Sequence, residues 1–201
     1  MSNVDRMRLI FNRQRELMEK YHPIEEANGL MQTTDCPVDI DSREGQARLK
    51  DFAWRITEEM GEAFTARGTD FYREELMDVL HFLTEFTILA GLDYDFLNKI
   101  EKWEDYLDTC CNLAYHYRLV KLDTLFTHTL TTLAMTCNHL KNKPWKQTLR
   151  PTDKLAFEAL IRNTWIWFFA ILLEEGMTSE DVLEGYLGKS EINRVRQAEG
   201  Y

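Results

Sequence analysis

The segment from residue 56 to residue 81 carries two pairs of acidic residues on either side of a break in the helical pattern. Glu59 and Glu62 form the first pair, Glu75 and Asp78 form the second, and the break is at Gly68. Residues three apart on a helix lie on one face, so each pair projects together. A chain reversal near Gly68 places Glu62 opposite Glu75 and Glu59 opposite Asp78. The sequence therefore predicts a central antiparallel helix hairpin in which four carboxylates converge.

Four carboxylates at close range raise one another's pKa unless a cation lies between them. Oxygen ligands suit hard divalent cations, so we expect a metal-binding hairpin that holds Mg²⁺, or Mn²⁺, with two or more ions in the site. The alternative is that these residues form the solvated faces of two surface helices. Apolar residues on the same helices argue against it, because they should pack the two helices together. These residues are Phe52, Ile56, Phe71, Val79, Phe82, Leu83 and Phe86.

The chain has 201 residues and no persistent alternation of apolar and polar positions, which predicts an all-α bundle of about six to seven helices. We expect residues 1–201 to form one domain, with a helical insertion at about residues 95–150 and a C-terminal arm at residues 188–201. Pro23 should end the first helix, Thr152 should cap the sixth helix, and Thr178 should open a short final one. The six helices before this final one are expected at about residues 4–20, 42–67, 69–90, 93–119, 123–140 and 152–175.

The charge balance is 24 basic against 34 acidic residues, a net of −10. Such a surface does not favour nucleic acid or an anionic membrane. The polar N-terminus shows no signal peptide, and the apolar run at residues 165–173 is shorter than the roughly 20 residues that span a bilayer. Four cysteines show no disulfide or metal spacing. We therefore expect a cytoplasmic protein that binds neither nucleic acid nor membrane.

The end of the chain is its most basic terminal segment. If it is helical, Lys189, Asn193 and Arg196 share one face. An ammonium, an amide and a guanidinium aligned in this way suit phosphate oxygens. By itself this pattern also fits a frayed, charged terminus. Beside a four-carboxylate metal site, however, the arm would supply the other half of a triphosphate site.

Two further polar residues adjoin the predicted core. Gln14 interrupts the apolar stripe of the first helix, where a contact to a ligand and a bond to the backbone are equally open. His81 lies one turn after Asp78 and either orients that carboxylate or is a core histidine with its hydrogen bonds satisfied. The apolar helix at residues 152–175 should be the most buried helix or part of a subunit interface.

The acidic motifs resemble those of the all-α nucleoside triphosphate pyrophosphohydrolases, which include the dimeric dUTPases and the MazG-type enzymes. The motif E-E-x-x-E ends at Glu62, and E-x-x-D followed by His-Phe begins at Glu75. The ending K-x-x-x-N-x-x-R-Q-x-x-G-Y at residues 189–201 is similar to the dimeric dUTPase branch, including phage dCTPase-dUTPase enzymes. The motif F-x-x-Q-x-x-L at residues 11–17 is similar to the first helix of that branch. No Asn or Asp closely follows Gln14 and no Trp-rich segment follows the E-E-x-x-E helix, so the base preference stays open.

The resemblance implies a homodimer that cleaves deoxynucleoside triphosphates between the α and β phosphorus atoms, giving a monophosphate and diphosphate. The substrate would be dUTP, dCTP or both; a MazG-like enzyme with another or broader set of nucleotides is the alternative. Gln14 would help to hold the base, and Lys189, Asn193 and Arg196 would bind the phosphates. Glu59, Glu62, Glu75 and Asp78 would bind the metal, with Glu62, or else Glu59, accepting a proton from the attacking water.

Two other classes of protein remain open. A di-iron carboxylate bundle needs two carboxylate-histidine pairs, and Asp78 with His81 could join Glu19 with His22. Iron in the purified protein would indicate this class. A non-catalytic helical module that oligomerises would show no thermal shift with metal.

Overall fold

The computed structural model describes residues 5–29, 31–96 and 105–199. Within these ranges the chain forms helices and no β-strand, which confirms the predicted all-α class. The elements are α1 (Arg6–Ala27), α2 (Arg43–Ala66), α3 (Tyr72–Leu89), α4 (Tyr106–Ala114), the 3₁₀ helix η1 (Tyr115–Tyr117), α5 (Leu122–His139), α6 (Lys154–Glu174) and α7 (Ser179–Ala198).

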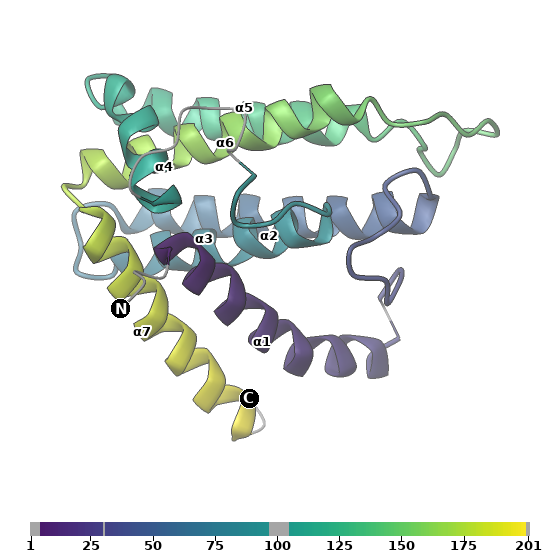
Figure 1. Cartoon of the computed structure of the whole chain (residues 1–201), viewed down its shortest axis with the longest axis horizontal. Helices are drawn as coiled ribbons and strands as arrows, with labels where there is room; N and C mark the ends of the chain where they lie inside the picture. Colours follow the sequence, from purple (N-terminus) through teal and green to yellow (C-terminus); the bar gives the residue numbers. More distant parts are fainter. Residues whose placement is uncertain (1–4, 30, 97–104, 200–201) are drawn as a thin grey trace.

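The helices are arranged in three tiers (Figure 1). α5 and α6 lie side by side in one tier, α2 and α3 form the middle tier, and α1 and α7 lie on its far side. α4 packs against α6 at one end. α3 contacts α1, α2, α6 and α7, so it is the central helix of the bundle.

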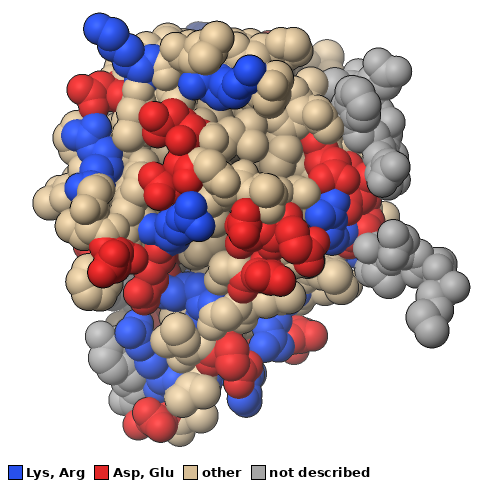
Figure 2. Space-filling model, turned by 90° about the vertical axis from the view of Figure 1, so that its left-hand side faces the viewer, with Lys and Arg blue, Asp and Glu red and all other residues tan. Residues whose placement is uncertain are grey.

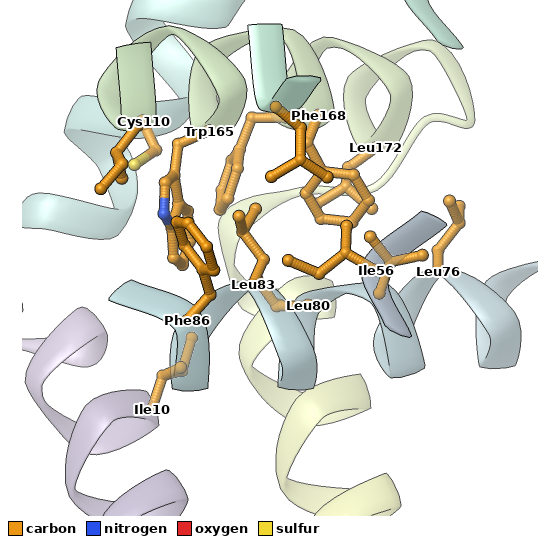
Figure 3. Close-up of a cluster of buried hydrophobic side chains, with 14 of the residues drawn as sticks. Ile10, Ile56, Leu76, Leu80, Leu83, Phe86, Cys110, Trp165, Phe168 and Leu172 are labelled. Atoms are coloured by element: carbon orange, nitrogen blue, oxygen red, sulfur yellow. The ribbon is translucent and has the colours of Figure 1, made fainter. Parts of the chain in front are cut away.

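The core lies between α3 and α6 (Figure 3). Leu80, Leu83 and Phe86 project into it from α3, because positions three apart share one face of a helix. Trp165 and Phe168 project into it from α6. Each of these side chains is buried, and burial of one such side chain contributes about 1.5–3 kcal/mol to the free energy of unfolding.

α6 is not the most buried helix, which was one of the two possibilities predicted for it. Trp165 is fully buried and its Nε1 donates a hydrogen bond to Thr87 Oγ1 at 2.9 Å, but Leu155 and Asn163 on another face are exposed. α3, enclosed by four helices, is the most buried helix instead. By length and composition, α6 is also the one helix in the described part of the chain that could cross a membrane. The apolar run at residues 165–173 had been judged too short to do so, but the apolar part of the helix is longer than that run. Half of its apolar window is buried within the bundle, as in core helices of soluble proteins, which meet the same criteria.

α1 continues through Pro23 to Ala27, so the prediction that proline would end it is wrong. A proline within a helix removes one backbone hydrogen bond. The last turn of α1 is held by Glu25, which pairs with Arg48 and, at 2.6 Å, with Arg55 Nη2. Arg48 is only 2% exposed. These ion pairs with α2 therefore offset the lost hydrogen bond.

α2 and α3 are consecutive helices joined by a tight turn. Ser42 caps α2 as predicted, accepting a hydrogen bond from the backbone N–H of Gly45. Gly68 in the turn has φ of 77°, a conformation that favours glycine. The rings of Phe52 and Phe82 lie 6.2 Å apart between the two helices. The turn thus returns α3 along the side of α2.

Two other helix boundaries differ from the prediction. Residues 93–96 do not continue a helix and α4 begins only at Tyr106; the intervening part of the predicted helix lies outside the described residues. Asp153 rather than Thr152 caps α6, because its carboxylate accepts from the backbone N–H of Ala156. The Thr152 hydroxyl instead donates to the carbonyl of Ile40 at 2.8 Å.

α7 is longer than predicted. It begins at the predicted capping box of Thr178 and Asp181, and it continues through Gly188 to Ala198. Lys189 and Asn193 therefore belong to the second half of a continuous helix. The last two residues of the predicted arm lie outside the described part of the chain.

Surface charges are largely mixed in sign. On the face shown in Figure 2, acidic and basic side chains are interspersed and form no continuous basic patch. Arg6 illustrates how such charges connect helices: its guanidinium lies 2.5 Å from Asp105 and 2.6 Å from Asp108 at the start of α4. It also lies 3.3 Å from Glu180 in the first turn of α7. Arg6 therefore joins α1, α4 and α7.

The first turn of α2 leaves no room for a side chain at Gly45, since an added Cβ would lie 2.1 Å from the carbonyl oxygen of Asp39. We predict that Gly45→Ala lowers the free energy of unfolding by about 1–3 kcal/mol through overpacking. Gly61→Ala is the control, because nothing lies within 4 Å of its added carbon. It should raise stability by up to about 1 kcal/mol through helix propensity. Urea unfolding followed by circular dichroism compares the two, and equal effects would contradict the close approach.

Candidate active site

Three carboxylates meet between α2 and α3. Glu59 and Glu62 lie one turn apart on α2, and Glu75 lies in the first turn of α3. One oxygen from each lies within 4.8 Å of the others, which is close enough to share a metal ion. This is the one such group of acidic, histidine or cysteine side chains in the described ranges. It contains no histidine, which argues against the di-iron alternative.

The acidic group is electrostatically unfavourable without a cation. Burial, followed by the charges of Asp78, Glu62 and Glu75, raises the pKa of Glu59 to about 7. The pKa of Glu75 is raised by burial and then by Asp78 and Glu62. Removing carboxylates from water and placing them together both disfavour ionisation. A positive ion in the group would relieve that repulsion.

Asp78, the fourth predicted carboxylate, is paired with Lys189 from α7. Lys189 Nζ lies 2.7 Å from Asp78 Oδ2 and 2.7 Å from Glu74 Oε1. Burial lowers the pKa of Lys189, but the hydrogen bonds and charges of these two carboxylates outweigh it and leave the pKa raised. Lys189 is therefore a charged ammonium beside the acidic group.

One cavity of about 540 Å³ contains every residue predicted for the site. α2 and α3 contribute the acidic residues, α7 contributes the basic and amide residues, and α1 contributes the glutamine. The predicted residues in its lining are Gln14, Glu59, Glu62, Glu75, Asp78, His81, Lys189, Asn193 and Arg196. Acidic and basic groups thus face the same space.

Gln14 is the centre of a buried hydrogen-bond network. Its Oε1 accepts from Tyr186 Oη at 2.6 Å and lies 2.9 Å from His81 Nδ1. Its Nε2 donates to Glu85 Oε2 at 2.8 Å, and Glu85 Oε1 lies 3.2 Å from His22 Nε2. Because a carboxylate only accepts, Glu85 determines which way the amide points. Three of the amide's hydrogen-bonding positions are therefore used within the protein.

His81 has a different partner from the predicted one. Its Nδ1 contacts Gln14 rather than Asp78, and its ring stacks on Tyr186 with centroids 4.1 Å apart. Burial lowers the pKa of His81 to about 3, so the ring is neutral. Since Gln14 Oε1 can only accept, the proton is on Nδ1, and Nε2 has no hydrogen-bond partner among the described residues.

Several residues of the cavity were missed by the sequence analysis. Arg55 lies beside Glu25 at the end of α1, with its guanidinium 4.4 Å from the centre of the Phe52 ring. Glu74 and Glu85 also line the cavity. Arg55 and Glu74 each lie four residues before a predicted ligand, so helical spacing would have indicated both. No local pattern indicates that Glu85 is buried.

Comparison with known proteins found one family. The model of a family described as dUTPase matches residues 63–201, which is more than half of the chain. The matched part includes Glu75, Asp78 and all of α7, whereas Glu59 and Glu62 precede it. No curated protein and no solved structure shows a significant match to the chain.

The raised pKa of Glu59 predicts how the metal-free protein responds to pH. Between about pH 4.5, the ordinary value for a glutamate, and about pH 7, the folded state holds a proton that the unfolded state has lost. Stability should therefore fall as the pH rises across this range and then level off. The melting temperature in EDTA measures the fall. Glu59→Gln should make this fall in melting temperature smaller, whereas Glu58→Gln, which changes an exposed neighbour, should leave it as in the wild type. A fall of the same size in Glu59→Gln would contradict its assignment to Glu59.

Proposed function

The chain belongs to the dUTPase family of all-α nucleoside triphosphate pyrophosphohydrolases, and from this premise we propose that it hydrolyses dUTP, dCTP or both to the monophosphate and diphosphate. The reaction would require Mg²⁺, or Mn²⁺, and take place in the cytoplasm on free nucleotides. One observation supports this proposal most strongly: a single cavity joins the carboxylate group of α2 and α3 to the phosphate-compatible face of α7.

The residues of the acidic group fit a hard divalent cation. Glu59, Glu62 and Glu75 offer oxygen atoms, and their mutual repulsion would be relieved by a positive charge. Asp78 is proposed as the fourth ligand, and four carboxylates would supply oxygen ligands for two or more ions. A divalent ion supplies Lewis-acid chemistry, neutralising charge on phosphate oxygens and lowering the pKa of a water.

The chain's own residues would position the reactants. Glu62 is proposed to accept the proton of the attacking water, because its carboxylate is exposed to solvent at the acidic group; Glu59 is the alternative. Lys189, Asn193 and Arg196 would hold the phosphates, since their donors match phosphate oxygens. Holding the triphosphate between the two faces of the cavity would align it for in-line attack.

The base would lie at the α1 side of the cavity. Gln14 keeps one amide N–H that is not used in its protein network, and it also fixes the position and protonation of His81. Leu17 and Phe82 add apolar surface to the cavity lining. We therefore propose that Gln14 belongs to the base site. It would contact the base directly, and it would also orient the imidazole ring of His81 toward the base.

A nucleotide panel tests the function. Diphosphate release should be fastest with dUTP or dCTP and Mg²⁺, and it should stop in EDTA. Equal rates with all nucleotides would favour the broader MazG-like reading. No release with any nucleotide, and no thermal shift with metal, would indicate a non-catalytic helical module.

Glu62→Gln and Asp78→Asn are each predicted to lower kcat by at least about 10²-fold while the protein stays folded, because loss of a ligand or base removes transition-state stabilisation. Steady-state rates and circular dichroism measure the two effects. Glu44→Gln removes an exposed carboxylate in the first turn of α2, at the other end of that helix from the acidic group, and should retain activity. Either site variant keeping more than about a tenth of the wild-type rate would contradict the assignment.

We also propose that the protein is a homodimer. The outer face of α5 carries no Asp, Glu, Lys or Arg from residue 124 to residue 139, although the chain as a whole is 29% charged. Its exposed side chains are Thr124, Thr127, His128, Thr131, Ala134, Met135 and Asn138. Depletion of charge and a central methionine are typical of protein–protein interfaces.

Light scattering at micromolar concentration should give twice the mass of one chain. Met135→Glu should shift the protein to the monomer, because it places a charge that must be desolvated in the interface. Thr148→Glu, in the exposed loop before α6, is the matched control and should stay dimeric. A monomeric wild type would overturn the proposal, and a dimeric Met135→Glu protein would move the interface elsewhere.

A further inference from the structure

The Asp78 end of the acidic group already holds a cation that belongs to the protein. Lys189 Nζ bridges Asp78 Oδ2 and Glu74 Oε1, each at 2.7 Å, and the lysine is only 7% exposed. Glu74 and Asp78 are four residues apart on α3 and so lie on one face. α7 inserts the ammonium between them.

This arrangement conflicts with a purely phosphate-binding role for Lys189. An ammonium tied to two carboxylates has only one of its three donors left. In turn, the ammonium already neutralises Asp78 through one of its two carboxylate oxygens. Two positive charges on one carboxylate would repel each other strongly in a partly buried site. Lys189 and a metal ion therefore compete for Asp78.

We propose, on the basis of the proposed function, that Lys189 neutralises Asp78 in the free protein and that a metal ion replaces Lys189 at Asp78 when the nucleotide binds. The incoming phosphate offers the ammonium a new anionic partner, and the released Asp78 becomes available to the metal. Glu74 keeps the lysine at the cavity throughout, since it is paired with the ammonium but lies outside the three-carboxylate group. Glu74 is thus a positioning residue for the exchange.

The exchange makes metal binding and triphosphate binding help each other. The triphosphate attracts Lys189 away from Asp78, and the metal ion attracts Asp78 away from Lys189. Each ligand therefore makes binding of the other more favourable, and such coupling is reciprocal. The metal-free, nucleotide-free protein is meanwhile relieved of part of its carboxylate repulsion. The acidic group would therefore bind metal weakly by itself and more tightly once a triphosphate is present.

Mn²⁺ binding measured by calorimetry without nucleotide tests this directly. Lys189→Met should lower the Kd for Mn²⁺ by at least about tenfold, because the competing charge is gone. Lys189→Gln, which keeps hydrogen-bond donors for both carboxylates, should do the same if the methionine variant does not fold. Arg196→Ala removes a positive charge that acts on Asp78 through the cavity but does not contact it, so it should lower the Kd clearly less than Lys189→Met does.

Two double variants distinguish competition for Asp78 from a general effect of the Lys189 charge on metal affinity. In an Asp78→Asn background the Lys189→Met substitution should change the Kd much less, since the contested carboxylate is absent and only the weaker effect of the ammonium on Glu59 and Glu75 is left. Glu74→Gln should weaken Mn²⁺ binding in the wild type, where Lys189 then turns fully to Asp78, and have a smaller effect in Lys189→Met.

The outcomes distinguish the two proposals. Lys189→Met and Lys189→Gln proteins that bind Mn²⁺ with the wild-type Kd would overturn the exchange and leave the metal site standing. A change in Kd as large in Arg196→Ala as in Lys189→Met would also overturn it. Wild-type protein that binds no Mn²⁺ at millimolar concentration, with or without a non-hydrolysable deoxynucleoside triphosphate, would overturn the proposed metal-dependent function and the exchange with it.

Discussion

The packing of α2 against α3 is the constraint on which the rest of the structure depends. Apolar side chains such as Phe52, Ile56 and Leu80 draw the two helices together and are buried. The same approach brings Glu59 close to Glu75 and disfavours their ionisation. Hydrophobic burial thus holds in place an electrostatic arrangement that would not form by itself. The fold itself therefore keeps these carboxylates together.

Much of this could be predicted from local rules. Helical periodicity identifies which residues share a face, and a glycine break identifies where the chain turns back, so the grouping of Glu59, Glu62 and Glu75 follows from spacing alone. The same rule places Lys189 and Asn193 on one side of a helix. The all-α class and most helix positions were predictable for the same reason, because they depend on residues close together in the sequence.

The parts that escaped prediction depend on contacts between distant segments. Pro23 was expected to end α1, but the partners that hold the last turn, Arg48 and Arg55, belong to α2. The pairing of Lys189 with Asp78 joins α7 to α3 across the cavity. Gln14 lies on the predicted stripe, yet the network that uses its amide comes from α3 and α7. A single sequence shows which residues can form such contacts but not which ones meet.

The continuity of α7 through Gly188 gives the site a mechanical property. The start of the helix is tied to α1 and α4 by Arg6, which contacts Ser179, Glu180 and Asp105. Arg196 lies near the other end, roughly 26 Å away at about 1.5 Å per residue. The second half of α7 is held as well: Arg13 on α1 donates to Ser190 Oγ at 2.9 Å and to Glu191 Oε2 at 3.0 Å, and Lys189 pairs with Glu74 and Asp78 on α3. Because one uninterrupted helix joins these two sets of contacts, the position of the basic residues at the cavity depends on the junction around Arg6 as well as on the contacts beside them.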